Sequence, residues 1–165
     1  MSSSLIRKFP DPILRHPSKS IKKFDSSLKR LVDRLIKIMK SQPGGIGIAA
    51  PQIGVLRKVA IVDVSPKTPN SHLLILINPE IIQVDEEIIL REGCMSLSDY
   101  TANVKRFNQV SIKYRTLSGK MQTYTASGLE SRCIQHEIDH LNGILFVDRV
   151  TSIKSDVFRR KRYKS

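Results

Sequence analysis

The sequence has no tryptophan, 5% aromatic residues and only two cysteines among its 165 residues. Two cysteines are too few for a disulfide scaffold, and the opening residues 1–7 lack the apolar core of a signal peptide. There is no apolar run of 18 residues anywhere, which argues against a membrane-spanning helix. Residues 9–15 already resemble mature domain and leave little room for a transit peptide. We therefore expect a bacterial-type, cytoplasmic protein with no membrane partner.

Acidic residues are also scarce: Lys and Arg number 28 against 15 Asp and Glu, a net charge of +13. Much of the positive charge is terminal, within residues 7–23 and 159–164. Two explanations remain open, a solvated surface that aids solubility or attraction to a polyanion, with RNA first in line. Residues 152–164 are predicted to form a C-terminal helix, with Ser152 or Ser155 as its cap and basic residues at its end.

A chain of this length is expected to form one domain, residues 1–165, that buries about two-thirds of its unfolded surface. Apolar residues at helical spacing predict a helix over 26–40, which Pro43-Gly44 would end. Strands are predicted over 58–64, 73–78, 81–90, 109–114 and 121–125, with a hairpin turn at 117–120. We therefore predict an α+β fold, mostly antiparallel, around a central buried helix.

The central helix is predicted over 128–141 and contains the pattern His136-Glu137-x-x-His140. Ser127 and Glu130 have the spacing of a capping box, and Asn142-Gly143 supplies a stop. His136 and His140 are four residues apart and share a face. Two adjacent buried imidazoles indicate a metal site, and the alternative is two core histidines satisfied by hydrogen bonds.

A third ligand would favour the metal. Cys133 lies within the same predicted helix and is expected to pack there. Cys94 lies in a polar, glycine-containing turn, 91–96, where a thiol can point into a cleft. A Cys-His-His set leaves one tetrahedral position open for water, as catalytic sites do.

The glycine-rich stretch 44–52 matches the relaxed dinucleotide fingerprint at Gly45-x-Gly47-x-x-Ala50. That fingerprint requires a strand before it and a helix after it, whereas here a helix precedes and Pro51 with Gly54 prevents a helix afterwards. The small residues instead predict a strand that another backbone can approach closely. Gln52 would bring a side-chain amide to the end of that strand.

Taken together and in this order, three segments resemble the signature motifs of peptide deformylases: Gly45-Ile46-Gly47-Ile48-Ala49-Ala50-Pro51-Gln52, Glu92-Gly93-Cys94-Met95-Ser96 and Gln135-His136-Glu137-Ile138-Asp139-His140. Residues 9–15 and 141–149 also resemble the family, so the resemblance covers nearly the whole chain. It implies metal-dependent hydrolysis of the N-formyl group from the formylmethionine of new polypeptides, with release of formate. The remaining alternatives are a generic metallopeptidase and a basic ribosome- or RNA-binding module with a structural metal.

The residues themselves suggest the chemistry. Cys94 as thiolate and two neutral imidazoles would hold one divalent metal. Glu137 is placed to take the proton of a water and to deliver it to the leaving amine. The Gln52 amide and the backbone N–H of Met95 are the expected donors to the oxyanion. Thiolate and imidazole ligands admit Fe²⁺, Zn²⁺, Ni²⁺ or Co²⁺; the resemblance favours Fe²⁺ in vivo, with the others possible in purified protein.

The resemblance further implies that the peptide adds as a strand beside residues 45–47. Backbone contacts would come from Ile46, Gly47 and Gly93. Wall candidates for the methionine pocket are Ile46, Leu129, Cys133 and the His136 ring, although plain core packing is equally open for each.

Outside the ligand set, Glu92 is expected to accept a hydrogen bond from His136 and to be held by Arg106. Many members of the family carry proline and arginine where this chain has Ser98 and Thr101, which leaves peptide contacts at the cleft mouth open. We expect a monomer, with the basic C-terminal segment as a candidate for docking on the ribosome.

Overall fold

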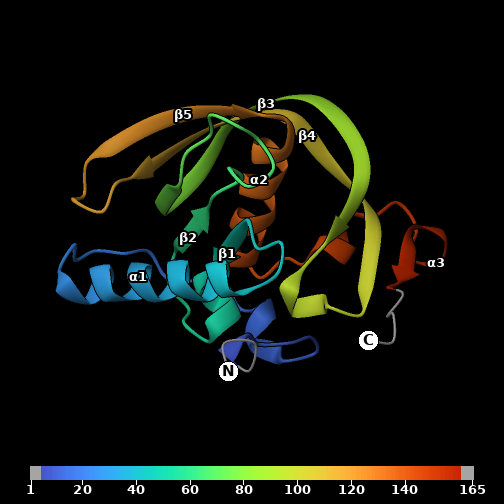
Figure 1. Cartoon of the computed structure of the whole chain (residues 1–165), viewed down its shortest axis with the longest axis horizontal. Helices are drawn as coiled ribbons and strands as arrows, with labels where there is room; N and C mark the ends of the chain where they lie inside the picture. The colour runs from blue at the N-terminus through green and yellow to red at the C-terminus, as the bar shows by residue number, and fades with distance from the viewer. Residues whose placement is uncertain (1–4, 161–165) are drawn as a thin grey trace.

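The computed structural model describes residues 5–160, which form a six-stranded antiparallel sheet around a central helix (Figure 1). The strand order is β1-β2-β3-β4-β5, and β6 pairs with β4. The strands are β1 (Gly47–Ala49), β2 (Val59–Val62), β3 (Leu74–Gly93), β4 (Tyr100–Arg115), β5 (Met121–Ser127) and β6 (Val157–Arg159). The α-helices are α1 (Ser26–Ser41), α2 (Gly128–Leu141) and α3 (Ile153–Asp156). Short 3₁₀ helices are η2 (Pro12–Arg15), η3 (Ala50–Ile53), η4 (Met95–Leu97) and η5 (Phe146–Arg149). The predicted α+β class is confirmed.

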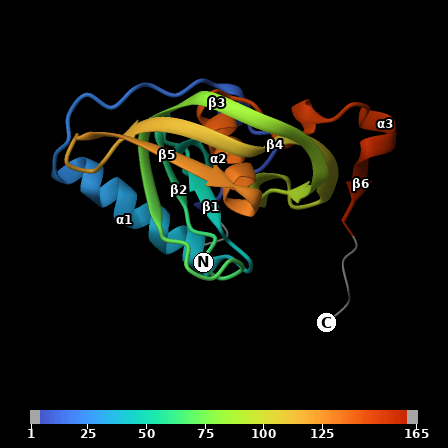
Figure 2. The same cartoon turned by 90° about the horizontal axis from the view of Figure 1, so that it is seen from above.

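The long hairpin of β3 and β4 arches over α2, and Figure 2 shows the two strands curving together toward β6 and α3. The sequence predicted two strands, 73–78 and 81–90, because a proline such as Pro79 usually ends a strand. In the structure these two segments form one continuous strand, β3. The structure accommodates Pro79 at an irregularity in the register between Ile77 and Glu80, where Asn78 adopts a φ of 52°. β4 begins at Tyr100, nine residues earlier than predicted. The prediction missed this part of the strand because Arg106, a charged residue at a buried position, interrupts the apolar alternation.

Helix α1 covers the lower part of the sheet and packs against β1 and β2. The Asp25 side chain accepts hydrogen bonds from the backbone N–H groups of Ser27 and Leu28, which caps the helix. Its buried residues follow helical spacing: Leu28, Val32, Leu35, Ile38 and Met39. The predicted helix 26–40 is therefore confirmed, with its apolar face against the core.

Helix α2 lies at the centre of the molecule, and nearly all of its residues are buried. The predicted span is confirmed, but the predicted capping box is wrong. The Ser127 side chain makes no cap hydrogen bond, and Ser127 instead ends β5 opposite Gln109. Glu130 accepts a hydrogen bond from the Tyr124 hydroxyl at 2.5 Å, so its carboxylate is turned to the sheet and not to the helix start.

The predicted C-terminal helix over 152–164 is wrong beyond its first turn. Helix α3 ends at Asp156, and residues 157–159 form β6 against Tyr100–Ala102 of β4. A β-branched and an aromatic residue, Val157 and Phe158, favour the strand. Ser152 does cap α3, as expected, by accepting from the Ser155 N–H at 3.4 Å. Residues 161–164 of the predicted helix lie outside the described part of the chain.

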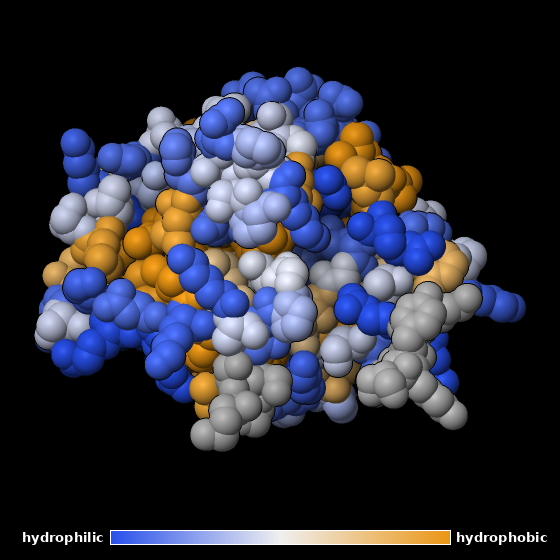
Figure 3. All heavy atoms as spheres, viewed as in Figure 1, coloured by the Kyte–Doolittle hydropathy of each residue, from blue (hydrophilic) through white to orange (hydrophobic). Residues whose placement is uncertain are grey.

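The surface is largely hydrophilic on the face of Figure 3, with an apolar patch over the arch of β3. Within β3, Ile89 and Leu90 are about half exposed, at 54% and 45%. Within residues 5–160, no helix has the length and hydrophobicity that a membrane-spanning segment requires.

We predict that Leu35→Ala, which empties a fully buried site on α1, lowers the free energy of unfolding by about 2–5 kcal/mol. The matched change Leu90→Ala removes the same atoms from an exposed site and should alter it by less than about 0.5 kcal/mol. Urea unfolding of both variants measures the difference. Equal losses would contradict the assignment of α1 to the core.

Candidate metal centre

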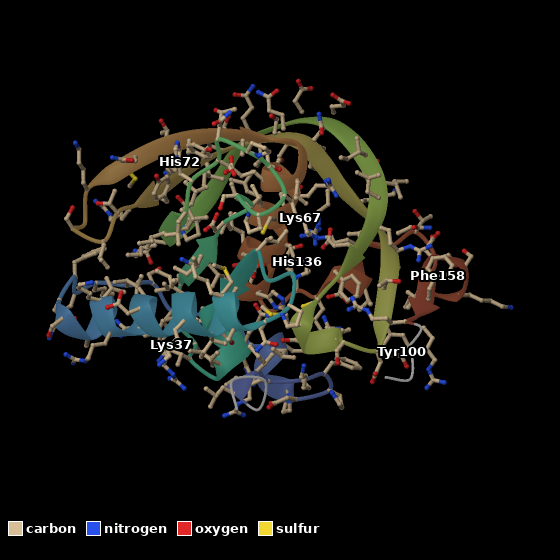
Figure 4. The ribbon with its side chains drawn as sticks, in the orientation of Figure 1. Lys37, Lys67, His72, Tyr100, His136 and Phe158 are labelled. Atoms are coloured by element: carbon tan, nitrogen blue, oxygen red, sulfur yellow. The ribbon has the colours of Figure 1, made fainter. Side chains whose placement is uncertain are left out.

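Cys94, at the end of β3, lies against His136 and His140 of α2, and all three are buried. One ligand atom from each falls within 4.8 Å of the others. Cys94 Sγ is 3.3 Å from His140 Nε2, and the two imidazole centroids are 5.0 Å apart. Figure 4 shows His136 near the middle of the molecule. The structure thus brings together the three residues that the sequence predicted.

The orientation of His136 is held by Glu92 and Arg106. Glu92 Oε1 lies 2.5 Å from His136 Nδ1, and Arg106 donates to both Glu92 oxygens at 2.7 and 3.1 Å. Burial favours a raised pKa for Glu92, but His136 and Arg106 outweigh it and lower the pKa to about 2. With Nδ1 committed to the carboxylate, Nε2 remains as the ligand atom.

Arg106 is anchored by a second carboxylate, that of Asp139. Arg106 Nη1 donates to Asp139 Oδ2 at 2.6 Å. Arg149 of η5 also donates to Asp139, at 2.8 and 3.1 Å. Sequence reasoning missed Asp139, although its place within the histidine motif, three residues after His136, was a usable signal. Arg149 gave no such signal.

The thiol of Cys94 is poised to ionise. Burial opposes ionisation, but the neighbouring imidazoles of His140 and His136 hold the pKa of Cys94 well below its usual range. The resulting thiolate raises the pKa of His136 well above its ordinary value, against the effect of burial. A divalent cation would replace the proton shared by these groups.

Gln52, in η3, links β1 to the cysteine turn. Its Oε1 accepts from the Ala49 N–H at 3.0 Å, which leaves Nε2 to donate to Ser96 Oγ at 3.1 Å. Nε2 also lies 3.8 Å from Cys94 Sγ. The amide orientation is therefore set by its neighbours, and Ser96 is a partner that sequence reasoning missed. Met95 is the first residue of η4 and directly follows Cys94. The backbone N–H of a first helical residue has no acceptor within its own helix, so that of Met95 is left to bind another group.

Glu137 turns its carboxylate toward β1. A Cβ on Gly47 would lie 2.6 Å from Glu137 Oε2 and 2.6 Å from Cys133 Sγ, so glycine allows this close approach. Glu137 Oε1 is buried and has no hydrogen-bond partner among the described residues. Burial raises the pKa of Glu137 to about 7, although His136 and His140 act in the opposite direction.

A cleft of about 550 Å³ opens over these residues. The predicted site residues that line it are Ile46, Gly47, Gln52, Glu92, Gly93, Cys94, Met95, Leu129, Cys133, His136 and Glu137. His140 and Arg106 lie beneath it, as ligand and as support. Ser98 is at the cleft wall, whereas the Thr101 hydroxyl accepts from Arg91 at 3.3 Å.

The donor set fits a divalent transition metal. Three buried ligand atoms, one of them a sulfur with a lowered pKa, converge in a cleft that leaves room for a further ligand. Magnesium and calcium prefer oxygen ligands and do not suit a thiolate with two imidazoles.

Comparison with known proteins agrees with this geometry. Residues 4–156 match the family model described as polypeptide deformylase. The chain belongs to the polypeptide deformylase family. A peptide deformylase of Thermodesulfovibrio yellowstonii is 42% identical over 156 residues, which cover 94% of both chains. One from Agrobacterium fabrum is 43% identical over 157 residues, 94% of this chain and 92% of the relative.

Solved deformylase structures share the fold. That of Thermotoga maritima superposes with a TM-score of 0.82 at 36% identity, over 89% of this chain and 97% of the other. That of Synechococcus elongatus, in complex with actinonin, gives a TM-score of 0.83 at 36% identity, over 89% and 80%. The predicted family resemblance is confirmed, and neither a generic metallopeptidase nor a basic binding module is favoured.

We predict that Cys94→Ser loses the metal. A serine hydroxyl does not supply a thiolate, and loss of a ligand should exceed the 10- to 100-fold cost of losing a supporting contact. Metal affinity should therefore fall more than about 100-fold.

Cys133→Ser is the matched control. Cys133 Sγ lies 3.5 Å from the Ile46 carbonyl oxygen, which a serine hydroxyl can also reach, so metal binding should be retained. Metal analysis after dialysis against a weak chelator measures both variants. Full metal content in Cys94→Ser would refute its role as a ligand.

Proposed function

We propose that this deformylase removes the N-formyl group from formylmethionyl peptides as they leave the ribosome, with Glu137 as general base and acid. The observation that carries the proposal is the buried Glu137 carboxylate, with one oxygen unpartnered, next to the Cys94-His136-His140 cluster. A carboxylate with a pKa near 7 is suited to both accepting and donating a proton at neutral pH.

Cys94, His136 and His140 would hold the divalent metal, which when bound supplies a Lewis acid that acidifies water and polarises a carbonyl. Glu137 accepts a proton from the water that attacks the formyl carbon. It then donates that proton to the amide nitrogen as the C–N bond breaks. The products are formate and a free amino terminus, so atoms and charge balance.

Charge that develops on the formyl oxygen requires donors. We assign them to Gln52 Nε2 and to the backbone N–H of Met95, because both belong to groups that line the cleft beside Cys94. Ser96 and Ala49 hold the Gln52 amide in one orientation, so it needs no rearrangement during the reaction.

The peptide is proposed to add as a strand to β1, which lies at the edge of the sheet. Ile46, Gly47 and Gly93 line the cleft on both sides of that path and would supply backbone contacts. Leu129 and Cys133 line the same cleft and would form the apolar wall around the methionine side chain.

The metal in vivo is proposed to be Fe²⁺, as the family resemblance implies. The thiolate and imidazole ligands also admit Zn²⁺, Ni²⁺ and Co²⁺, which are expected substitutes in purified protein. Metal analysis of anaerobically purified protein tests this assignment.

Both cysteines are free, which suits a reducing cytoplasm. We further propose that residues 1–165 act as one monomeric domain that works co-translationally, with the net charge of +13 aiding encounter with the ribosome.

We predict that Glu137→Gln keeps the metal but lowers the rate of formate release by about 10²–10⁴-fold, since the amide cannot carry the proton. Glu130→Gln is the matched control, a buried glutamate on the same helix that bonds Tyr124 outside the cleft. It should retain turnover. Formate release and metal content are measured on the same preparations. Near-normal turnover in Glu137→Gln would refute the general-base role, and joint loss of metal and activity would make Glu137 structural.

A further inference from the structure

The active-site cleft carries an excess of positive charge at its mouth. Its basic lining residues come from five separate parts of the chain: Lys8, Lys67, Arg91, Arg132 and Arg160. The acidic lining residues are Glu137, which is buried, and Glu92, whose partly buried carboxylate is held by Arg106 and His136 at the metal centre. The rim that a peptide meets first is therefore basic.

Arg160 is brought to the cleft by the unexpected strand β6. Its backbone N–H donates to the Asp99 carbonyl oxygen at 2.8 Å, which continues the pairing of β6 with β4. The Arg91 guanidinium stacks 3.8 Å from the centre of the Phe158 ring and ties β6 to β3 as well. Figure 4 shows Phe158 of β6 and Tyr100 of β4 on the same side of the molecule, where these two strands pair.

The side chain of Arg160 reaches the peptide path itself. A Cβ built on Gly93 would lie 2.3 Å from Arg160 Nη2, so the guanidinium crosses directly over the Gly93 backbone. Gly93 is one of the residues proposed to contact the peptide backbone. A side chain of a bound peptide at this point would meet the guanidinium.

The rim charges are not neutralised within the described part of the chain. None of the five forms an ion pair with a residue among 5–160, whereas Arg7, Arg15, Lys29 and Lys113 each do. Arg91 donates to the neutral oxygens of Asn103 and Thr101, and Lys8 donates to the Met95 carbonyl. The buried Nε of Arg132 has no hydrogen-bond partner there. A carboxylate of the peptide would supply the missing counter-charge.

We infer that the cleft prefers formylated peptides that carry acidic side chains in the residues directly after formylmethionine, with Arg160 as a peptide-binding residue. This inference rests on the proposed deformylase function. An exposed carboxylate–guanidinium pair typically changes an equilibrium by about 1.5- to 5-fold. The preference should therefore be several-fold per acidic residue, should act mainly on KM, and should weaken in salt.

The test compares formyl-Met-Ala-Glu, formyl-Met-Ala-Gln and formyl-Met-Ala-Lys, all with amidated C-termini, as substrates of the metal-loaded enzyme. We expect kcat/KM to fall in that order, by severalfold from the glutamate to the lysine peptide in low salt. The ratio should shrink toward one at about 1 M NaCl, where the Debye length is about 3 Å.

Three variants assign the effect. Arg160→Gln should reduce the glutamate-to-lysine ratio, and Arg160→Glu should reduce it further or invert it. Arg159→Gln removes the same charge from the neighbouring exposed residue, which does not line the cleft, and should keep the wild-type ratio.

Equal kcat/KM for the three peptides, or an unchanged ratio in both Arg160 variants, would overturn the inference while leaving deformylation intact. No formate release from any peptide by the wild-type enzyme would overturn the proposed function instead, so the two failures are distinct.

Discussion

A guanidinium buried between a sheet and a helix must find enough acceptors to offset the loss of its hydration, and Arg106 finds them on two of the elements that form the site. It is only 3% exposed and binds Glu92 of β3 and Asp139 of α2. Removing one partner of such a buried pair typically costs about 3–5 kcal/mol, because a charge is left uncompensated. The ion pairs therefore fix how β3, β4 and α2 meet, and through Glu92 they set the orientation of a metal ligand.

The way β1, β3 and α2 meet places the metal ligands and the proton-transferring carboxylate side by side. β3 ends beside α2 and delivers Cys94 to the two imidazoles, while Gly47 of β1 lets the Glu137 carboxylate sit beside the same cluster. A buried carboxylate with a pKa near 7 would be a poor choice for stability, since its charged form is desolvated. It is a suitable choice for moving a proton, and perturbed acids of this kind gather at functional sites.

Much of the site was predictable because two of its three metal ligands lie four residues apart on one helix. The four-residue spacing of His136 and His140, with apolar residues on a second stripe, defined α2 and its burial. Cys94 was identified by its turn, and family motifs placed Gln52 and Glu92.

The supporting contacts of Asp139, Arg149 and Ser96 were not predicted, because they depend on register and tertiary pairing. Arg106 was expected to hold Glu92, but a charged residue at a buried strand position does not fit an apolar alternation, and this concealed the first half of β4. Pro79 suggested a strand end that the structure absorbs at an irregularity in the register. The capping serines and the terminal basic residues suggested a long C-terminal helix, but strand pairing with residues 100–102 replaced it and placed Arg160 at the cleft. Local sequence signals predict secondary structure poorly where a segment can pair with a neighbouring strand.

The most direct test of the Cys94-His136-His140 metal centre is X-ray absorption at the metal edge of the purified, metal-loaded protein. With zinc bound, we expect one sulfur at about 2.3 Å and two imidazole nitrogens at about 2.0–2.1 Å, together with one light-atom ligand from solvent. A first coordination shell without sulfur, or one with nitrogen and oxygen ligands only, would contradict the assignment of Cys94 and with it the proposed metal centre.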